Sequence, residues 1–456
     1  MTPNRRWEFY GFGYLRLVTT VKQQDSRLYV GAIAIGLAAA GLALLRLWLG
    51  NHEAITQVVW AEDGLFPLCI QKAGFFTCLV DPFAGYLLFL PRLIAGVVQL
   101  FPESAWPLVT NLLAAGIAGL VSALSFVIMR RFGTGVIASL VVALLPVLAP
   151  IVGLEALNAL GSMYMLLIFL CTLVIAFPSH TVSRRWLSML LVAVLFLLTS
   201  LTIPLAGILL GLIAIQAIRR VITVRATVIW TVSICLGLIA QVFTAVTAAS
   251  PRKMSPSWAS LDSWADGSVQ GILTYWPGLT SDNVSVFGMT TVFPAPLTGA
   301  LVVLAVGILG ITLVVRGGDR RVGIALLLLG GLAYGALPTI IGWANNRYFV
   351  VPALLWGAAL LVALDPLIRR TKAWVLVVAA GVIGILWWPM LAASPYRSTP
   401  APRWSDEVAR IAYKCNEDPS LMERPIFSPF WPPNWGDGLT EPTHPDITCI
   451  VGRKWS

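Results

Sequence analysis

The sequence predicts an all-α, multi-pass membrane protein with about 11 transmembrane helices, external helices near the membrane and a small external tail. Its composition is the first observation: 58% of the 456 residues are hydrophobic and only 11% are charged, whereas soluble domains carry roughly 25% charged residues. The second is that apolar residues gather in runs long enough to cross a bilayer. The third is that short basic clusters separate these runs, as topogenic signals do. The apolar composition makes a lipid bilayer the expected partner, and the net charge of +10, divided among these clusters, gives no support to nucleic-acid binding.

The expected spans divide the chain into a cytoplasmic segment 1–27, a transmembrane domain 28–392 and an external tail 393–456. We expect no cleavable signal peptide, because the first apolar run is itself long enough to span. Pro204 divides the run 186–218 into two spans, since proline removes a helix N–H group. The spans are 28–49, 105–129, 135–153, 158–177, 186–201, 204–218, 226–248, 297–315, 322–342, 348–367 and 373–392.

Basic residues fall in every second connection, which orients the chain by the positive-inside rule. The cytoplasmic side receives more than half of the 31 basic residues, and most of the 21 acidic residues fall on the other side. The amino terminus is therefore expected in the cytoplasm. The carboxyl terminus and any active site are expected on the external or periplasmic side. The pairs that carry this pattern are Arg130-Arg131, Arg184-Arg185, Arg219-Arg220, Arg320-Arg321 and Arg369-Arg370.

The apolar stretch 85–100 follows the first expected span and precedes the second. It carries Pro91 and Arg92, and at about 16 residues it is short for a span. Counting it as a crossing would place the later basic pairs outside. We therefore expect an interfacial helix on the outer leaflet, with Arg92 extending to water as Arg46 does at the end of the first span. The segment 50–104 becomes one long outer loop, and 249–296 is another.

Four of the six cysteines fall in the expected outer segments. Cys69 and Cys78 share the first outer loop, and Cys415 and Cys449 share the tail. Because an external compartment is oxidising, two disulfides are the simplest interpretation. The alternative is that both pairs are free thiols.

Two adjacent acids mark the first outer loop, where residues 58–67 read VVWAEDGLFP. Glu62 and Asp63 lie between apolar and aromatic neighbours that favour the membrane interface, where neighbouring carboxylates repel each other. Glu103, just before the second span, adds another acid to this segment. The alternative is a solvated loop whose charges only mark the outer boundary.

Chemistry on the outer side restricts the activated donor. The chain has neither a glycine-rich phosphate loop between a strand and a helix nor a cytoplasmic domain for a nucleotide. A donor must then arrive attached to a lipid, as polyprenyl-phosphate sugars do. Inverting displacement of the phosphate needs one carboxylate to take the acceptor proton, and cationic groups to hold the departing phosphate. No cofactor is indicated, although a divalent cation would also serve to hold the phosphate.

Several short motifs, in order, resemble the GT-C superfamily of membrane glycosyltransferases, which includes protein O-mannosyltransferases and the lipid A aminoarabinose transferase. WAEDG follows the first span, and the amphipathic DPFAGYLLFLPRLIAG is similar to a juxtamembrane segment of that family. Glu103 opens the second span and MRRFG closes it. NRYFVVPALL resembles the opening of a late span. The resemblance covers about residues 28–392.

This resemblance implies an inverting transfer from a polyprenyl-phosphate sugar to a glycan, lipid or protein acceptor. It implies Asp63 as the base with Glu62 supporting it, although the family's Asp-Glu-basic order is absent, so either carboxylate remains open as the base. Glu103 would be the second acid at the substrate. Arg347, with Arg252 or Lys253, would hold the donor phosphate, and Tyr348 of the late-span motif would also contact the substrate. Glu155, at an outer helix end, is a further candidate contact, for which a simple boundary charge is the alternative.

Two rival functions remain. A lipid-linked sugar flippase or transporter predicts ionisable residues near the membrane midplane and an internal repeat, and the sequence shows neither. An O-antigen ligase or polymerase also acts outside on lipid-linked sugars, but depends more on basic residues in a later loop. Here that loop is 249–296, with Arg252 and Lys253.

Overall fold

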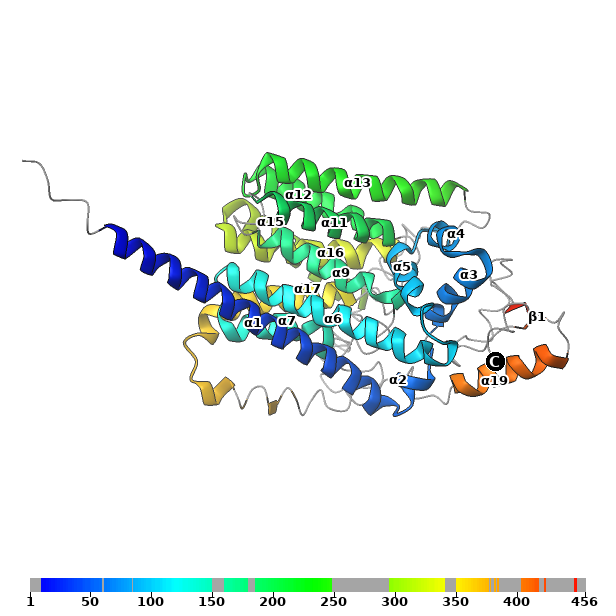
Figure 1. Ribbon diagram of the computed structural model, residues 1–456. Coiled ribbons are helices and arrows are strands. Elements are labelled where there is room, and N and C mark those ends of the chain that lie inside the picture. The colour runs from blue at the N-terminus through cyan, green and yellow to red at the C-terminus, as the bar shows by residue number, and fades with distance from the viewer. Residues whose placement is uncertain are drawn as a thin grey trace, which may run out of the picture.

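The long helices of the chain run side by side in one bundle (Figure 1). Among the described residues, five helices are long and apolar enough to cross a membrane: α1 (Tyr10–Gly50), α6 (Trp106–Arg131), α13 (Val224–Thr247), α16 (Asp319–Ile340) and α17 (Val350–Ile368). The computed structural model describes residues 10–59, 61–83, 85–149, 160–178, 185–247, 295–340, 350–376, 378, 381–382, 384, 403–417, 422–423 and 447–448. This part of the chain is almost entirely helical, and its apolar helices suit a lipid bilayer.

Shorter apolar helices complete the bundle. Four of them follow one another along the chain, and a fifth precedes α16: α7 (Val136–Leu148), α9 (Tyr164–Ala176), α11 (Trp186–Thr202), α12 (Ile208–Ile218) and α15 (Ala295–Arg316). A helix of 13 residues, such as α7 or α9, extends only about 20 Å. The hydrocarbon core is about 30 Å thick. If such a helix lies within the hydrocarbon core, its last carbonyl groups cannot reach water at both surfaces and need hydrogen-bond donors from the protein.

Arg46 supplies donors to one of these helix ends. Its side chain on α1 is only 5% exposed, and it donates to the carbonyl oxygens of Val147 and Ala149 at the end of α7. The expectation that Arg46 extends to water is therefore wrong. The guanidinium lies between α1 and α7, where the unpaired carbonyl groups at the end of α7 accept its hydrogen bonds.

Two glutamines do the same for other helices. Gln216 of α12 donates to the last carbonyl groups of α9, the nearer at 2.7 Å. Gln241 of α13 donates to the carbonyl groups that end α11, the nearer at 2.9 Å. Both side chains are buried. The polar residues inside this apolar bundle therefore satisfy the backbone of their neighbours.

Small residues bring α1 and α6 into close contact. A Cβ atom on Gly119 of α6 would lie 2.5 Å from the carbonyl oxygen of Gly36 and 3.2 Å from Ala40 on α1. Such small-residue contacts let membrane helices approach by backbone-to-backbone packing. The first and second predicted spans are joined in this way.

Short helices cover one end of the bundle, at the right in Figure 1. They come from the first outer segment and from the tail: α2 (Ala54–Gln57), the 3-10 helices η1 (Ala61–Gly64) and η2 (Glu103–Ala105), α3 (Leu65–Ala73), α4 (Phe75–Val80), α5 (Phe89–Val98) and α19 (Trp404–Glu417). We call this set the cap layer. Helix α5, from the stretch expected at the interface, packs against α3, α4, α6 and α11 and does not run the length of the bundle.

Arginines gather at the opposite end. The carboxylate of Asp365 is fully buried there and pairs with Arg320 at 2.9 Å and Arg369 at 2.7 Å. It also accepts the N–H of Gly135, the residue before α7, at 2.9 Å. The helix ends that the charge pattern assigns to one side of the membrane thus meet at one end of the bundle.

The predicted spans coincide with helices wherever the structure describes them. Most of the eleventh, 373–392, lies outside the described residues, as do residues 249–294 of the outer loop 249–296; its last two residues belong to α15. Arg369 contacts Gly133 at the arginine-rich end of the bundle. Arg403, just before α19, contacts Glu53 at the opposite end. In the tail, strands β1 (Met422–Glu423) and β2 (Ile447–Thr448) pair antiparallel.

Candidate functional site

The acidic turn η1 is joined to the start of the apolar helix α9. Asp63 is 1% exposed. Its two carboxylate oxygens accept the backbone N–H groups of Leu160 at 2.8 Å and Gly161 at 2.7 Å. These residues form the 3-10 helix η3 (Leu160–Ser162), which leads into α9. The first N–H groups of a helix lack intrahelical partners and favour a negative charge, so Asp63 fixes the turn to the bundle.

Glu62 occupies the preceding position of the same turn. Its side chain lies outside the described part of the structure, as does residue Trp60. The chain continues from η1 into α3 without a break, so the acidic turn is directly connected to α3.

Glu103 is held from two sides. Its carboxylate accepts a hydrogen bond from the side-chain amide of Gln71 on α3 at 3.1 Å. Its main-chain carbonyl accepts the indole N–H of Trp404 on α19 at 2.8 Å. Trp404 is buried and stacks on Trp106, with ring centroids 6.1 Å apart. Glu103 therefore lies where α3, α6 and α19 meet.

The tail helix α19 belongs to the same end of the molecule as the first outer segment. Arg403 pairs with Glu53, and the N–H of Ser405 donates to the side chain of Gln57 at 3.2 Å. Two segments expected on the same side of the membrane, the first outer loop and the tail, are therefore in direct contact.

A disulfide joins α3 to α4. Cys69 and Cys78 are bonded, with Cα atoms 5.8 Å apart. Gly74 makes the reversal between the two helices at a φ of +86°, a left-handed conformation that glycine adopts without strain. The other predicted pair lies beyond the described residues: Cys449 entirely, and Cys415 in its side chain.

Arg92 lies beneath this disulfide-linked pair of helices. It is 3% exposed, donates to the carbonyl oxygens of Cys78 (2.6 Å) and Asp81, and lies over the ring of Phe66 at 5.9 Å from its centroid. The expectation that Arg92 extends to water is therefore wrong. A local apolar pattern indicates that an arginine is near an interface, but it does not indicate that the end of another helix, here α4, supplies acceptors for it.

Burial governs the ionisation of this pair. It lowers the pKa of Arg92 to about 10, and the nearby charge of Asp81 opposes this effect. Burial likewise raises the pKa of Asp81, with Arg92 acting in the opposite direction. The guanidinium and the carboxylate are 3.6 Å apart. With a pKa of about 10, Arg92 therefore stays charged near neutral pH.

Helix α5 is tied to the bundle through its own start. Gln241 of α13 pairs with both main-chain groups of Leu87, accepting from N–H at 2.8 Å and donating to the carbonyl at 3.0 Å. The N–H of Leu90 donates to the hydroxyl of Thr202 at 3.2 Å. Sequence reasoning missed Gln241; a lone amide within the apolar run 226–248 was the available signal.

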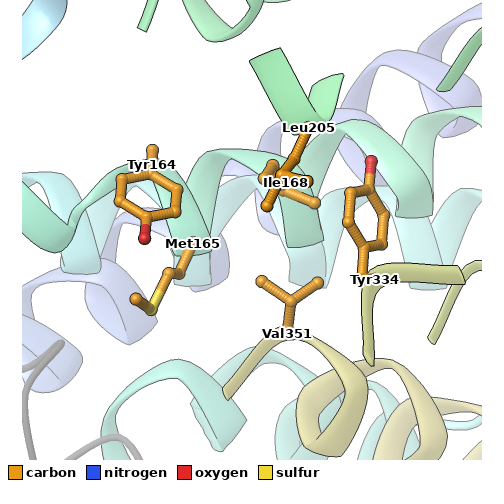
Figure 2. A pocket seen from close by; sticks show the side chains of 6 residues that line it. All are labelled: Tyr164, Met165, Ile168, Leu205, Tyr334 and Val351. Carbon is orange, nitrogen blue, oxygen red and sulfur yellow. The ribbon is translucent and has the colours of Figure 1, made fainter. Parts of the chain in front are cut away.

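A small apolar cavity lies within the bundle (Figure 2). Its lining comes from α9, α16, α17 and the 3-10 helix η4 (Pro204–Gly207). Its volume of about 10 Å³ has room for roughly one water molecule, so it is not a substrate site. The lining residues are Tyr164, Met165, Ile168, Leu205, Tyr334 and Val351.

The remaining predicted site residues lie outside the described residues: Glu155, Arg252, Lys253, Arg347 and Tyr348. Within the part that the structure describes, no three His, Cys, Asp or Glu side chains come together as metal ligands. No protein-family model matches the chain, and no curated protein is similar to it in sequence. The described part of the site offers an anchored acidic turn and a second held carboxylate in the same cap layer.

Proposed function

We propose that this chain is an inverting membrane glycosyltransferase that uses a polyprenyl-phosphate sugar on the outer side of the membrane. The observation that carries the proposal is the anchoring of the acidic turn by Asp63 at the start of α9. A fixed carboxylate at the end of an apolar bundle is suited to a donor whose phosphate lies at the membrane surface. The phosphate leaves without a general acid, so one carboxylate acting as base is sufficient.

The hydrogen bonds of Asp63 support a division of roles within the turn. Each of its oxygens already accepts a backbone N–H group, which supports Asp63 as the residue that fixes the turn. Glu62 then takes the acceptor proton, and Glu103, held by Gln71, is the second acid of the site.

The donor phosphate is assigned to Arg347 with Arg252 or Lys253, aided by a divalent cation if one binds. Tyr348 and Glu155 complete the proposed substrate contacts. The acceptor is a glycan, a lipid or a protein.

The buried charges of the membrane helices support an enzyme over a transporter. A substrate pathway calls for ionisable side chains along the bundle interior. In the described helices, Arg46 and Asp365 are buried, and both are engaged with the ends of neighbouring helices. Their contacts account for them without a transported substrate.

The test compares the two acids of the turn in purified protein with a defined polyprenyl-phosphate sugar, following the release of polyprenyl phosphate in the presence of envelope glycans, lipids or proteins. We expect Glu62→Gln to lower kcat by roughly 10²–10⁴-fold, the usual contribution of a general base. Glu53→Gln is the matched control, because Glu53 is an exposed acid of the same segment. Normal turnover in Glu62→Gln overturns the assignment of the base.

Two other outcomes point elsewhere. Turnover lost in Asp63→Asn and normal in Glu62→Gln would return the base to Asp63, provided that the variant keeps the wild-type melting temperature. Turnover lost in Arg252→Ala and Lys253→Ala, with both acids dispensable, would favour a ligase or polymerase of lipid-linked glycans.

A further inference from the structure

Arg92 connects three parts of the cap layer that are separate in sequence. It projects from α5, it donates to the carbonyl groups of Cys78 and Asp81 at the end of α4, and it lies over the ring of Phe66 in α3. Phe66 is 1% exposed and follows η1 by two residues. A single buried guanidinium therefore contacts the two helices that continue from the acidic turn.

The shape of the guanidinium accounts for these contacts. One terminal nitrogen reaches two carbonyl groups, the planar face lies over an aromatic ring, and the second terminal nitrogen faces Asp81. A lysine ammonium is a point charge and cannot make this combination of contacts. The Nε–H group of Arg92 is buried without a hydrogen-bond partner among the described residues, so the contacts of the two terminal nitrogens and of the planar face hold the side chain in place.

Covalent and hydrogen-bonded links complete a rigid connection. The start of α5 is fixed to the bundle by Gln241 and Thr202. Arg92 joins α5 to α4, and the disulfide joins α4 to α3. From α3, Gln71 reaches Glu103, and the preceding turn η1 carries Glu62 and Asp63. This connection therefore adds to the direct bonds of Asp63 with η3 and to the continuity of η2 with α6 in placing the acids relative to the bundle.

We propose that Arg92 is a positioning residue that sets the placement of the acidic turn and of Glu103 through the disulfide-linked helices α3 and α4. This rests on the proposed function as far as the chemistry of the acids is concerned. The placement itself is a structural property and can be measured without a sugar donor.

Hydrogen exchange measures the placement directly. In the full chain in lipid nanodiscs, the amides of Leu160 and Gly161 report whether Asp63 remains bonded to them. We expect Arg92→Lys and Arg92→Gln to speed their exchange by about tenfold or more, together with amides of α3, as local opening becomes easier. The double variant Cys69→Ser/Cys78→Ser is expected to give the same pattern.

Arg219→Gln is the matched control. Arg219 also donates to main-chain carbonyl groups, those of Val314 and Gly317, but at the arginine-rich end of the bundle. We expect it to leave exchange at Leu160 and Gly161 unchanged. If Arg92→Gln also leaves these amides and α3 unchanged, the positioning role of Arg92 is refuted.

Turnover kinetics add a second readout, because they separate the effect of a variant on kcat from its effect on the donor KM. We expect Arg92→Lys to lower kcat by on the order of 10²-fold with little change in the donor KM, since displaced catalytic groups cost about this much. Full activity in Arg92→Lys, with its charge but not its shape, refutes the geometric role. Faster exchange in a protein whose wild type transfers no sugar keeps the positioning inference and refutes the proposed function.

Discussion

The side-chain amide of Gln241 pairs with both main-chain groups of Leu87, in the manner of two paired backbone segments. The two residues are 154 positions apart, and one lies in a membrane helix while the other precedes α5. This pairing fastens the cap layer to the bundle. It also leaves a donor for the end of α11.

Replacing Gln241 by leucine should therefore destabilise the protein strongly. The variant leaves the N–H and carbonyl of Leu87 buried without partners, and each such group costs about 1–3 kcal/mol. Thermal unfolding in detergent measures the loss. Ser233→Ala is the control, because the hydroxyl of Ser233 donates to Ile229 in its own helix; equal melting temperatures for the two variants would contradict the role of Gln241.

The two acids of the turn should differ in their effect on stability. Asp63→Ala removes the acceptor for two backbone N–H groups at the start of η3 and should cost about 1–3 kcal/mol or more. Asp63→Asn keeps one carbonyl acceptor and should lose less. Chemical unfolding followed by tryptophan fluorescence orders the variants. An Asp63→Ala variant as stable as the wild type would show that the bonds to Leu160 and Gly161 contribute nothing.

The close approach of α1 and α6 makes Gly119 intolerant of substitution. In Gly119→Ala the new Cβ atom would lie 2.5 Å from the carbonyl oxygen of Gly36, so the helices must separate, at a cost of about 1–3 kcal/mol. Gly116→Ala, on the same helix, meets no atom within 4 Å and should be neutral or slightly stabilising. A lower melting temperature for Gly116→Ala than for Gly119→Ala would contradict this expectation.

The attachment of α19 should depend on tryptophan packing more than on its ion pair. Trp404 is buried against Trp106, and truncation of such a residue to alanine costs about 3–5 kcal/mol. Arg403 and Glu53 are 56% and 44% exposed, and exposed pairs contribute about 0–1 kcal/mol. Limited proteolysis should therefore release the tail in Trp404→Ala and not in Glu53→Gln. Release in the reverse order would show that the ion pair dominates.

The sequence predicted the helices better than their contacts. Apolar runs and alternating basic pairs are local signals, and they located the membrane helices and the short helix α5. The contacts of Asp63 with Leu160 and Gly161, and of Arg46 with the end of α7, join residues about a hundred positions apart. No local pattern encodes where α7 stops relative to α1, or where α4 stops relative to α5, so Arg46 and Arg92 were both expected in water. Cys69 and Cys78 could be paired because they share one short loop.

The short helices also constrain the order in which segments of the chain can enter the membrane. When α7 enters the membrane, α1 with Arg46 has already been synthesised, so the end of α7 can be satisfied at once. The ends of α9 and α11 must wait for Gln216 and Gln241, about forty residues further along the chain. A nascent chain halted before Gln241 therefore exposes unsatisfied carbonyl groups to lipid. The segment from α9 to α13 is accordingly expected to enter the bilayer as one group.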